Sequence, residues 1–345
     1  MNTNNTKIYQ YLGAIHIHSK FSDGTGNIDV ITKAAKNANL DWIVITDHNN
    51  MDIPEGMING VCVIKGEEIS QPADNHYLAI DIDKTIQPDS EQNYVEAVRE
   101  LGGFGFAAHP DESLTRKNNS APIRWTNKEI IPDGIEIWNW FSQWADHYDS
   151  TSLFKIIYSF IFRHQLISKP YRETLEWWDN LNKKSKTFLP VIGGVDAHAL
   201  KISKYIIPVT VFPYETQFKT ITNVLQLKEP LSENFTDKKR QILNAIKAGN
   251  NIIINRRINK NLPEIVLVNP QETYCCGESI PLGKSTYLRI KIPIKAFVKI
   301  YKDGNEKYSE YTNNLIYSIS EYGKYRIEIE IETKGYIYTN VFVVI

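Results

Sequence analysis

The chain has 345 residues, of which 42% are hydrophobic and 23% are charged. This length suffices for one large domain or two, with a core large enough to fold without disulfides or a structural metal. The 39 basic and 40 acidic residues leave a formal charge of −1, which argues against a general nucleic-acid-binding or anionic-membrane-binding surface.

The first two thirds of the chain alternate between short apolar runs and segments in which apolar residues recur at helical spacing. The helical segments include residues 28–38 and residues 91–101, and the second of them is followed by two glycines. Strands that alternate with helices predict an α/β fold with a parallel sheet, and this number of units favours a closed or distorted barrel. The predicted strands are residues 12–18, 42–46, 61–65, 77–82, 105–108, 134–138, 190–193 and 207–212.

Residues 111–189 interrupt this alternation and are predicted to form a helical insertion rich in tryptophan. One interpretation of the insertion is an aromatic lid over a site at the end of the barrel. The other interpretation is that the tryptophans form the small core of the insertion itself, and the sequence leaves both open. The residues concerned are Trp125, Trp140, Trp144, Trp177 and Trp178.

After a last helix predicted over residues 237–248, the pattern changes to strands in which apolar and polar residues alternate. Residues 288–294 and 325–332 follow this pattern, and an Asp-Gly pair between them supplies a hairpin turn. Half-buried antiparallel strands without helices predict an immunoglobulin-like β-sandwich. The expected domains are a barrel over residues 8–255 and an antiparallel β-sandwich over residues 262–345.

The N-terminus and the cysteines indicate the compartment. The first residues are polar and lack the basic start and the apolar run of a signal peptide. Cys62, Cys275 and Cys276 provide no disulfide framework. We therefore expect a cytoplasmic protein with no membrane association, while the sequence leaves the oligomeric state open.

Side chains that bind metals stand near the ends of most of the predicted strands. His16 and His18 lie two residues apart in a strand, so their imidazoles point to the same side and suit chelation of a divalent ion. Each such residue alone has an ordinary explanation, such as capping a helix or facing solvent. Gathered at one end of a barrel, however, they would repel one another and lose hydration unless metal ions bind there. The other candidates are Asp23, His48, Glu68, His109, Glu136, Asp196 and His198.

The chain carries the motifs HIHSKFSDG, TDHN, GEE, AHP, GIEIWN and GVDAH, in this order. These motifs resemble those of the PHP (polymerase and histidinol phosphatase) superfamily of metal-dependent phosphoesterases. The resemblance covers about residues 8–255 and implies a distorted, seven-stranded TIM-like barrel that holds two or three divalent ions. Zn²⁺, Mn²⁺ and Fe²⁺ all suit imidazole and carboxylate ligands. The combination with a tryptophan-rich insertion and a C-terminal β-domain is more loosely similar to metallohydrolases grouped with carbaryl hydrolases.

The resemblance also implies how the metal ligands are divided. The implied ligands are His16, His18, Glu68 and Asp196 for a first ion, Glu68, His109 and Glu136 for a second, and Asp23, His48 and His198 for a third. Asp23 and Glu136 stand where many members of the superfamily carry histidine. Asp196 or His198 would pass a proton to the leaving group, and His76 matches a histidine that faces substrate in the superfamily.

These residues predict a hydrolase, most simply a phosphomonoesterase or phosphodiesterase that acts on a small phosphorylated molecule. A hydroxide that bridges two ions would attack the phosphorus directly, without a covalent intermediate. Among the arginines of the insertion, Arg116 is a candidate for clamping the phosphate. An alternative is hydrolysis of a carbamate, ester or amide by the same centre. A second alternative is a non-catalytic, metal-containing binding or structural protein.

Overall fold

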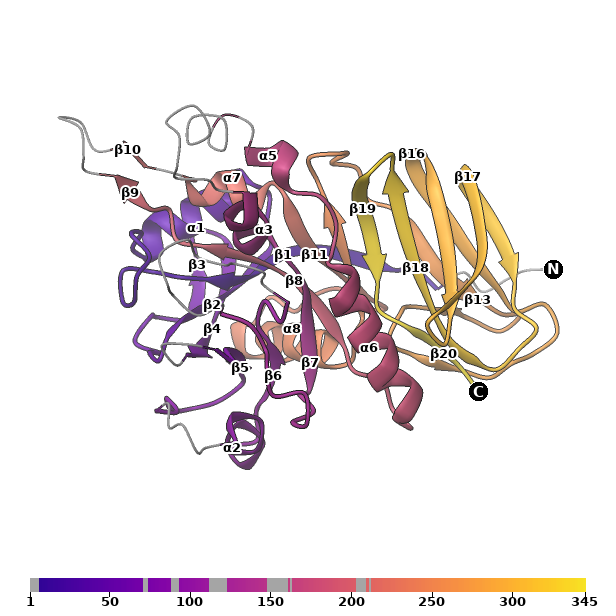
Figure 1. The fold of residues 1–345 in the computed structure, drawn as a ribbon, viewed down its shortest axis with the longest axis horizontal. Helices are drawn as coiled ribbons and strands as arrows, with labels where there is room; N and C mark the ends of the chain where they lie inside the picture. Colours follow the sequence, from indigo (N-terminus) through magenta and orange to yellow (C-terminus); the bar gives the residue numbers. More distant parts are fainter. Residues whose placement is uncertain are drawn as a thin grey trace.

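Seven strands close into a barrel in the computed structural model, which describes residues 6–70, 74–87, 93–111, 123–147, 161, 163–202, 209–210 and 212–345 (Figure 1). In chain order they are β1 (Tyr9–Ile17), β2 (Trp42–His48), β4 (Val61–Ile69), β5 (Tyr77–Ile80), β6 (Phe104–Ala107), β7 (Gly134–Asn139) and β8 (Val191–Ala197). Each strand pairs with the next in this order, and β8 pairs with β1 to close the ring. The seven-stranded α/β barrel expected from the sequence is confirmed.

The strand β5 runs against its two neighbours in the barrel. Its pairings with β4 and β6 are antiparallel, whereas the other pairings around the ring are parallel. The carboxyl ends of the six parallel strands therefore meet at one rim, and the amino end of β5 lies at that same rim. A short strand, β3 (Gly56–Ile58), pairs with the start of β4.

Buried apolar strands and amphipathic helices explain why the chain folds in this way. All but the last residue of β2 are buried, as is the whole of β8, which is typical of parallel strands covered on both faces. The helix α1 begins after Asn27, whose side chain accepts a hydrogen bond from the Val30 amide. The helices are α1 (Ile28–Asn37), α2 (Tyr94–Glu100), α3 (Trp140–His147), α5 (Arg163–Leu166), α6 (Arg172–Lys184), α7 (Tyr214–Phe218) and α8 (Phe235–Lys247).

Hydrogen bonding continues from the barrel into the C-terminal strands. The first half of β1 pairs with β11 (Ile221–Leu227), β11 pairs with β12 (Asn251–Asn255), and β12 pairs with β19 (Lys334–Thr339), all antiparallel. The Asn340 side chain accepts a hydrogen bond from the Val191 amide at 2.7 Å and donates to the carbonyl oxygens of Val191 and Asn251. The predicted domain boundary near residue 260 thus stays a prediction, and the sheet itself crosses that position.

The remaining C-terminal strands form two layers around an apolar core. Their pairings are antiparallel, except that Ser279–Ile280 pairs in parallel with Phe342–Val344. The hairpin of β16 and β17 belongs to both layers, because the start of β16 pairs with β13 and its end pairs with β18, with a break in register between Lys291 and Ala296. Side chains from both layers, including Leu267, Ile290 and Ile337, share one buried cluster. The immunoglobulin-like topology stays a prediction. The strands are β13 (Glu264–Val268), β14 (Thr273–Tyr274), β15 (Ser279–Ile280), β16 (Tyr287–Lys302), β17 (Asn305–Ser318), β18 (Gly323–Ile331) and β20 (Phe342–Val344).

The segment predicted as an insertion, residues 111–189, contains the barrel strand β7, and parts of it lie outside the described residues. Its tryptophans are mostly core residues. Trp140, Trp144 and Trp178 are buried in one cluster with residues of β7, β8 and β19. These three side chains thus pack in a core shared with the barrel and the C-terminal sheet. They form neither a lid nor a separate core of the insertion.

Two further expectations concern the last predicted strand and the absence of a membrane span. The strand predicted over residues 207–212 does not join the barrel in the part of the chain that is described, where β10 (Val209–Thr210) pairs only with β9 (Lys201–Ile202). Among the described residues, no helix has both the length and the apolar character needed to cross a bilayer.

The helix α6 connects the barrel to the C-terminal sheet (Figure 1). The Arg326 guanidinium on β18 donates two hydrogen bonds to the Asp179 carboxylate on α6, at 2.9 and 2.8 Å, and both side chains are almost fully buried. At the other end of the helix, the Thr174 hydroxyl donates to the Asp111 carboxylate at 2.7 Å. Asp111 follows His109 by two residues, so the helix contacts the segment that carries one of the predicted ligands.

Candidate metal centre

The predicted ligands gather at the barrel rim where the parallel strands end. His16 and His18 lie at the end of β1, and Glu68 and Asp196 lie near the ends of β4 and β8. His76 directly precedes β5, and because β5 is reversed, this position lies at the same rim. The other predicted ligands found there are Asp23, His48, His109, Glu136 and His198.

A first donor group consists of His16, His18, Glu68 and Asp196. The Nε2 atoms of both histidines lie 3.2 Å from Glu68 Oε2. The same two nitrogens lie 3.5 and 3.2 Å from Asp196 Oδ1. Ligand atoms around a tetrahedral zinc ion are about 3.4 Å apart, because Zn–N and Zn–O distances are about 2.0–2.1 Å. The distances from each imidazole to each carboxylate are therefore close to those between ligands of one divalent ion. The ligand atoms of His16, His18 and Glu68 also lie within 4.8 Å of one another as a set.

A second donor group shares Glu68 and adds His76 and His109. Glu68 Oε1 lies 2.8 Å from His76 Nδ1 and 3.2 Å from His109 Nε2. Since the other oxygen of Glu68 belongs to the first donor group, the carboxylate connects the two groups. A carboxylate in this position would be able to hold one ion on each side.

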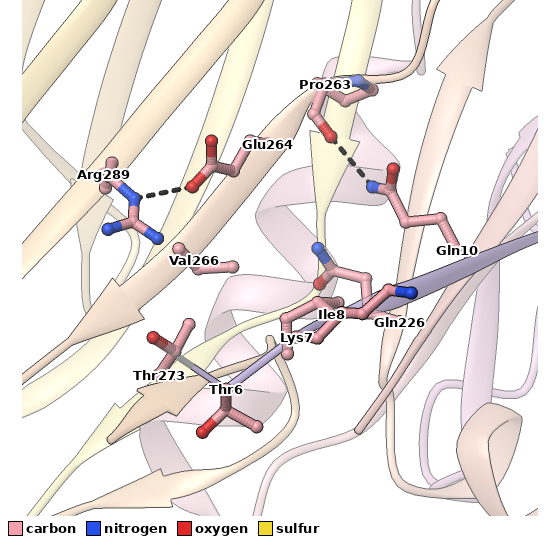
Figure 2. A pocket seen from close by; sticks show the side chains of 10 residues that line it. All are labelled: Thr6, Lys7, Ile8, Gln10, Gln226, Pro263, Glu264, Val266, Thr273 and Arg289. Carbon is pink, nitrogen blue, oxygen red and sulfur yellow. Dashed lines mark hydrogen bonds and ion pairs between the residues drawn. The ribbon is translucent and has the colours of Figure 1, made fainter. Parts of the chain in front are cut away.

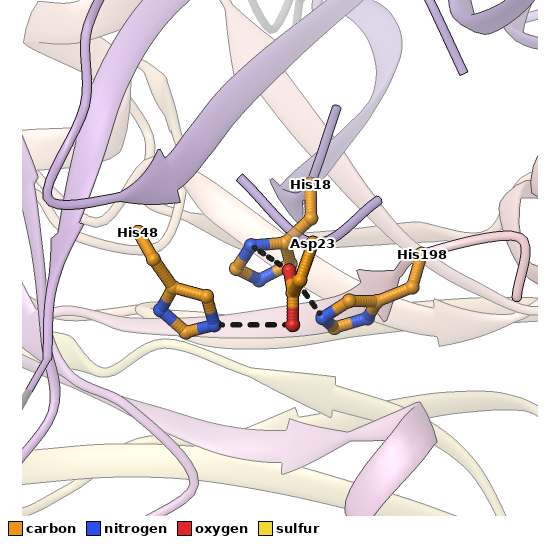
Figure 3. A group of neighbouring side chains, drawn as sticks. All are labelled: His18, Asp23, His48 and His198. Atoms are coloured by element: carbon orange, nitrogen blue, oxygen red, sulfur yellow. Dashed lines mark ion pairs between the residues drawn. The ribbon is translucent and has the colours of Figure 1, made fainter. Parts of the chain in front are cut away.

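A third donor group, drawn in Figure 3, consists of Asp23, His48 and His198 next to His18. Asp23 lies 3.2 Å from His198 Nε2 and 3.7 Å from His48 Nε2. Its carboxylate is 55% exposed and His48 is 27% exposed, so this group is the most open of the three. Although burial would raise the pKa of Asp23, the neighbouring His198 lowers it to about 2.

Unpartnered buried atoms support the fit of metal ions to these residues. Among the described residues, Nε2 of His16, Nε2 of His18 and Oε2 of Glu68 are buried and have no hydrogen-bond partner. Buried polar atoms are normally paired, and each one that is not requires an explanation. All three atoms point into the first donor group, where a divalent ion would satisfy them together.

Glu136 lies beside these groups, and both of its oxygens approach hydrogen-bonding groups of the protein. Its Oε1 lies 2.8 Å from His16 Nδ1, and its Oε2 accepts hydrogen bonds from the His109 amide at 2.7 Å and from Asn139 Nδ2 at 3.0 Å. Among the described residues, it is absent from the sets of three or more side chains whose ligand atoms lie within 4.8 Å of one another. Its predicted role as a ligand stays a prediction.

Burial and charge act in opposite directions on the pKa values of this cluster. Burial would lower the pKa of His18, but the carboxylates of Asp196 and Glu68 raise it to about 10. Burial likewise opposes ionisation of His16, yet three neighbouring carboxylates hold its pKa well above the usual value. Burial would raise the pKa of Glu68, which nearby imidazoles hold well below its ordinary range. Protons therefore occupy His16 and His18 when metal does not, and a metal ion must displace them.

Three of the site residues hold a backbone conformation that residues other than glycine rarely adopt. The φ angles are 69° at His16, 29° at His109 and 49° at Asp196. Such left-handed conformations cost about 1–3 kcal/mol each and persist where the surrounding structure imposes them. They occur here at the ends of β1, β6 and β8, where the chain must turn the side chain into the rim.

The structure adds supporting residues that the sequence analysis did not single out. Asp47, buried beside His48 in the TDHN motif, accepts three hydrogen bonds of 2.6 Å from Ser19 and Ser22, which fixes the loop after His18. The Tyr214 hydroxyl donates to the His18 carbonyl oxygen at 2.7 Å. Asp47 stood within a recognised motif, whereas no sequence pattern connects Tyr214 with residues almost 200 positions earlier.

Two other features concern the predicted phosphate clamp and a cavity. Arg116, the predicted phosphate clamp, lies outside the described residues. A cavity of about 210 Å³ between the start of β1 and the strands β13 and β16 is drawn in Figure 2. In that cavity Arg289 forms an ion pair with Glu264 at 2.6 Å, and Gln10 donates a hydrogen bond to the Pro263 carbonyl oxygen.

Comparisons with known proteins agree with this architecture. Residues 14–227 match the family model described as PHP domain. None of the curated proteins compared with the chain matches it.

Three solved structures are similar to the chain. A two-domain protein containing a predicted PHP-like metal-dependent phosphoesterase from Bacteroides vulgatus ATCC 8482 is 16% identical, with 99% of each chain covered and a TM-score of 0.47. PsfC from Pseudomonas syringae PB-5123 is 12% identical over 66% of this chain and 87% of its own, with a TM-score of 0.38. An amidohydrolase from Chromobacterium violaceum with bound sulfate is 14% identical over 59% of this chain and 92% of its own, with a TM-score of 0.33. The family match spans more than half of the chain, and the chain therefore belongs to the PHP domain family.

Proposed function

We propose that this protein is a metal-dependent phosphoesterase that acts on a small phosphorylated molecule. The observation that carries the proposal is the Glu68 carboxylate, whose two oxygens lie 2.8–3.2 Å from imidazoles of two adjacent donor groups. Adjacent ions joined by a carboxylate suit in-line displacement at phosphorus, because both the attacking and the leaving oxygen need positive charge nearby.

The residues of the first donor group would hold one ion, and Glu68 would share a second with the imidazoles of the second group. When bound, such ions supply Lewis acidity: they lower the pKa of a water from about 16 to about 7 and offset negative charge on phosphoryl oxygens. Zinc, manganese and ferrous iron all accept this mixture of imidazole and carboxylate donors. The proposal therefore includes two or three divalent ions without choosing among these metals.

The hydrogen bonds around His198 bear on which of its ring nitrogens carries a proton. His198 Nδ1 lies 3.0 Å from the Asp196 carbonyl oxygen, which can only accept, so this nitrogen donates. In the neutral ring Nε2 then carries the lone pair, and it faces Asp23 at 3.2 Å, as a ligand atom would. His198 is therefore suited to the third donor group, and transfer of a proton to the leaving group by Asp196 or His198 stays a prediction.

The test combines metal analysis with a substrate panel. Protein reconstituted with Zn²⁺, Mn²⁺ or Fe²⁺ is assayed on phosphate monoesters and diesters beside aryl carbamates, esters and amides. We expect turnover of phosphate esters, and a loss of about 100-fold or more in kcat/KM together with loss of bound metal in Glu68→Gln.

Glu67→Gln is the matched control, since Glu67 is the adjacent buried glutamate on β4 and its Oε2 accepts from the Ile86 amide instead. It should retain both metal and turnover. Hydrolysis of the carbamates, esters or amides alone would overturn the phosphoesterase proposal. Metal binding without turnover of any panel member would favour the non-catalytic alternative.

A further inference from the structure

A second cavity, of about 190 Å³, lies between the helix α6 and the strands β16 and β18. It shares no lining residue with the three donor groups of the metal centre. A buried water needs only about 10–15 Å³, so the cavity has room for a small organic molecule. Charged side chains of both signs line it. Three of them, Arg326, Glu328 and Glu330, alternate along β18 and therefore point to the same side of the sheet, towards α6.

The inner end of this cavity carries an excess of negative charge. One guanidinium, that of Arg326, pairs there with two carboxylates, because it donates to both oxygens of Asp179 and to Oε1 of Glu328. The Glu328 side chain is 6% exposed, and its Oε2 has no hydrogen-bond partner among the described residues. Buried polar atoms are normally paired, so this oxygen is available to a donor that occupies the cavity.

The outer end carries an excess of positive charge. The single carboxylate of Glu330 lies 3.1 Å from Lys169 Nζ and 2.8 Å from Lys299 Nζ. The two lysine side chains are 45% and 25% exposed, so this end is the more accessible one. Each ammonium has three N–H donors and gives only one of them to Glu330. Arg172 and Glu176, which also line the cavity, pair with each other along α6 and leave this balance unchanged.

We propose that this cavity binds a small zwitterion, with its cationic group on Glu328 and its anionic group on Lys169 and Lys299. Such a ligand offsets the excess charge at both ends, whereas a simple anion or cation would meet like charge at one of them. Backbone pairing places Lys299 directly opposite Glu328, and the Cβ atoms of opposite residues are about 4.5–5.5 Å apart. One small molecule therefore reaches both charges, and an α-amino acid is the simplest molecule of this class.

Calorimetric titration of the full-length protein with a panel of L-amino acids tests the proposal. Each amino acid is compared with the corresponding amine, which lacks the carboxylate, and with the corresponding carboxylic acid, which lacks the ammonium. We expect at least one amino acid to bind, and its two single-charge analogues to bind about 10-fold more weakly or less. Because both analogues are smaller than the amino acid, steric exclusion cannot explain such a loss. The titration requires neither a metal ion nor a phosphate ester.

Two variants place the ligand in the cavity. Glu328→Gln removes the charge at the inner end but keeps an oxygen that accepts from Arg326, and Lys299→Met removes an ammonium at the outer end. Each should weaken binding of the amino acid by about 10-fold or more. Glu332→Gln is the matched control, since it changes an exposed glutamate just beyond β18, and it should bind like the wild type. Thermal unfolding checks that each variant is folded.

Three results would overturn the proposal. The first is that no amino acid of the panel binds to the wild-type protein at millimolar concentrations, as expected of a cavity that holds only water. The second is that the single-charge analogues bind as tightly as the amino acid. The third is that a folded Glu328→Gln and a folded Lys299→Met both retain the wild-type affinity, which would place the ligand elsewhere on the protein.

Discussion

Glu67 and Glu68 are neighbours in the chain, yet they have opposite surroundings. Alternation along β4 turns Glu68 towards the imidazoles of the rim and Glu67 towards the segment after β5. Burial raises the pKa of Glu67 to about 7, opposed only by a hydrogen bond from the Ile86 amide. Its other oxygen has no hydrogen-bond partner among the described residues. Glu68 is therefore suited to binding a metal ion. Glu67, once ionised, is a buried charge that lowers the stability of the fold.

This raised pKa predicts a specific pH dependence of stability. The unfolded chain loses the Glu67 proton near pH 4.5 and the folded protein near pH 7, so the folded state binds more protons between these values. Stability must therefore fall as pH rises through this window. Glu67→Gln removes the effect, and its stability relative to wild type should increase by about 2 kcal/mol between pH 5 and pH 8.

Urea unfolding of the metal-free proteins at the two pH values measures this difference. Glu173→Gln, which changes an exposed carboxylate on α6, serves as the control and should show no such change. An equal stability difference between wild type and Glu67→Gln at both pH values would contradict the prediction.

At the scale of elements, β8 carries two adjacent glycines with different neighbours. A Cβ on Gly194 would collide with the Glu136 carboxylate and approach His16, whereas a Cβ on Gly193 would meet the Ile221 and Ile253 side chains at 2.6 and 2.7 Å. One glycine therefore leaves room for the metal centre, and the other leaves room for the core beneath it.

Gly194→Ala should displace Glu136 and with it His16, so we expect at least 10-fold weaker binding of the first metal ion as well as a loss of stability. Gly193→Ala should lower stability by about 1–3 kcal/mol through overpacking, with metal affinity unchanged. Zinc competition against a chelating dye and thermal unfolding measure the two quantities separately. Equal effects of the two substitutions on metal affinity would show that Gly194 has no specific role at the site.

The residues at the strand ends were predictable for two reasons. Side chains two residues apart in a strand point to the same side, and barrels place polar site residues directly after their apolar strands. His16, His18, Asp196 and His198 follow from that rule alone. The reversal of β5 could not be read, because YLAI is short and buried on both sides and looks the same in either direction. The resemblance placed His76 at the site as a residue that faces substrate, whereas in the structure its Nδ1 lies 2.8 Å from Glu68 Oε1.

Two other features could not be predicted from the sequence. They are the side-chain directions in β7 and the continuation of the sheet into the C-terminal strands. Glu136 stands in an apolar run, and only the packing of β7 against β8 decides that its oxygens meet His16 and a backbone amide. Similarly, the β12 run NIIIN could end a barrel as easily as it pairs with β19. In both cases long-range contacts decide between locally equivalent arrangements.

For the whole molecule, the continuous sheet makes the two parts dependent on each other. The backbone groups on the outer edge of β12 form their hydrogen bonds with β19. In addition, Ile221 and Ile253 share a buried cluster with Tyr338. Without the C-terminal strands, the edge of β12 and an apolar surface of the barrel would be exposed.

We therefore expect a chain truncated after residue 258 to be insoluble, or soluble without the wild-type circular dichroism and zinc binding. Co-expression of residues 259–345 as a separate chain should restore a soluble complex, which controls for the effect of the break itself. A folded, zinc-binding fragment of residues 1–258 would contradict the prediction and support an independent barrel domain.

The left-handed backbone at His16, His109 and Asp196 has a consequence for the lifetime of the protein. Residues other than glycine adopt these conformations at a cost in free energy. The three residues therefore lower the free energy of unfolding of the metal-free protein. An ion that binds only the folded chain adds stability in proportion to the logarithm of its free concentration over Kd. We therefore expect proteases to degrade the protein faster when metal is scarce. A shortage of metal should lower the amount of the protein in addition to its activity.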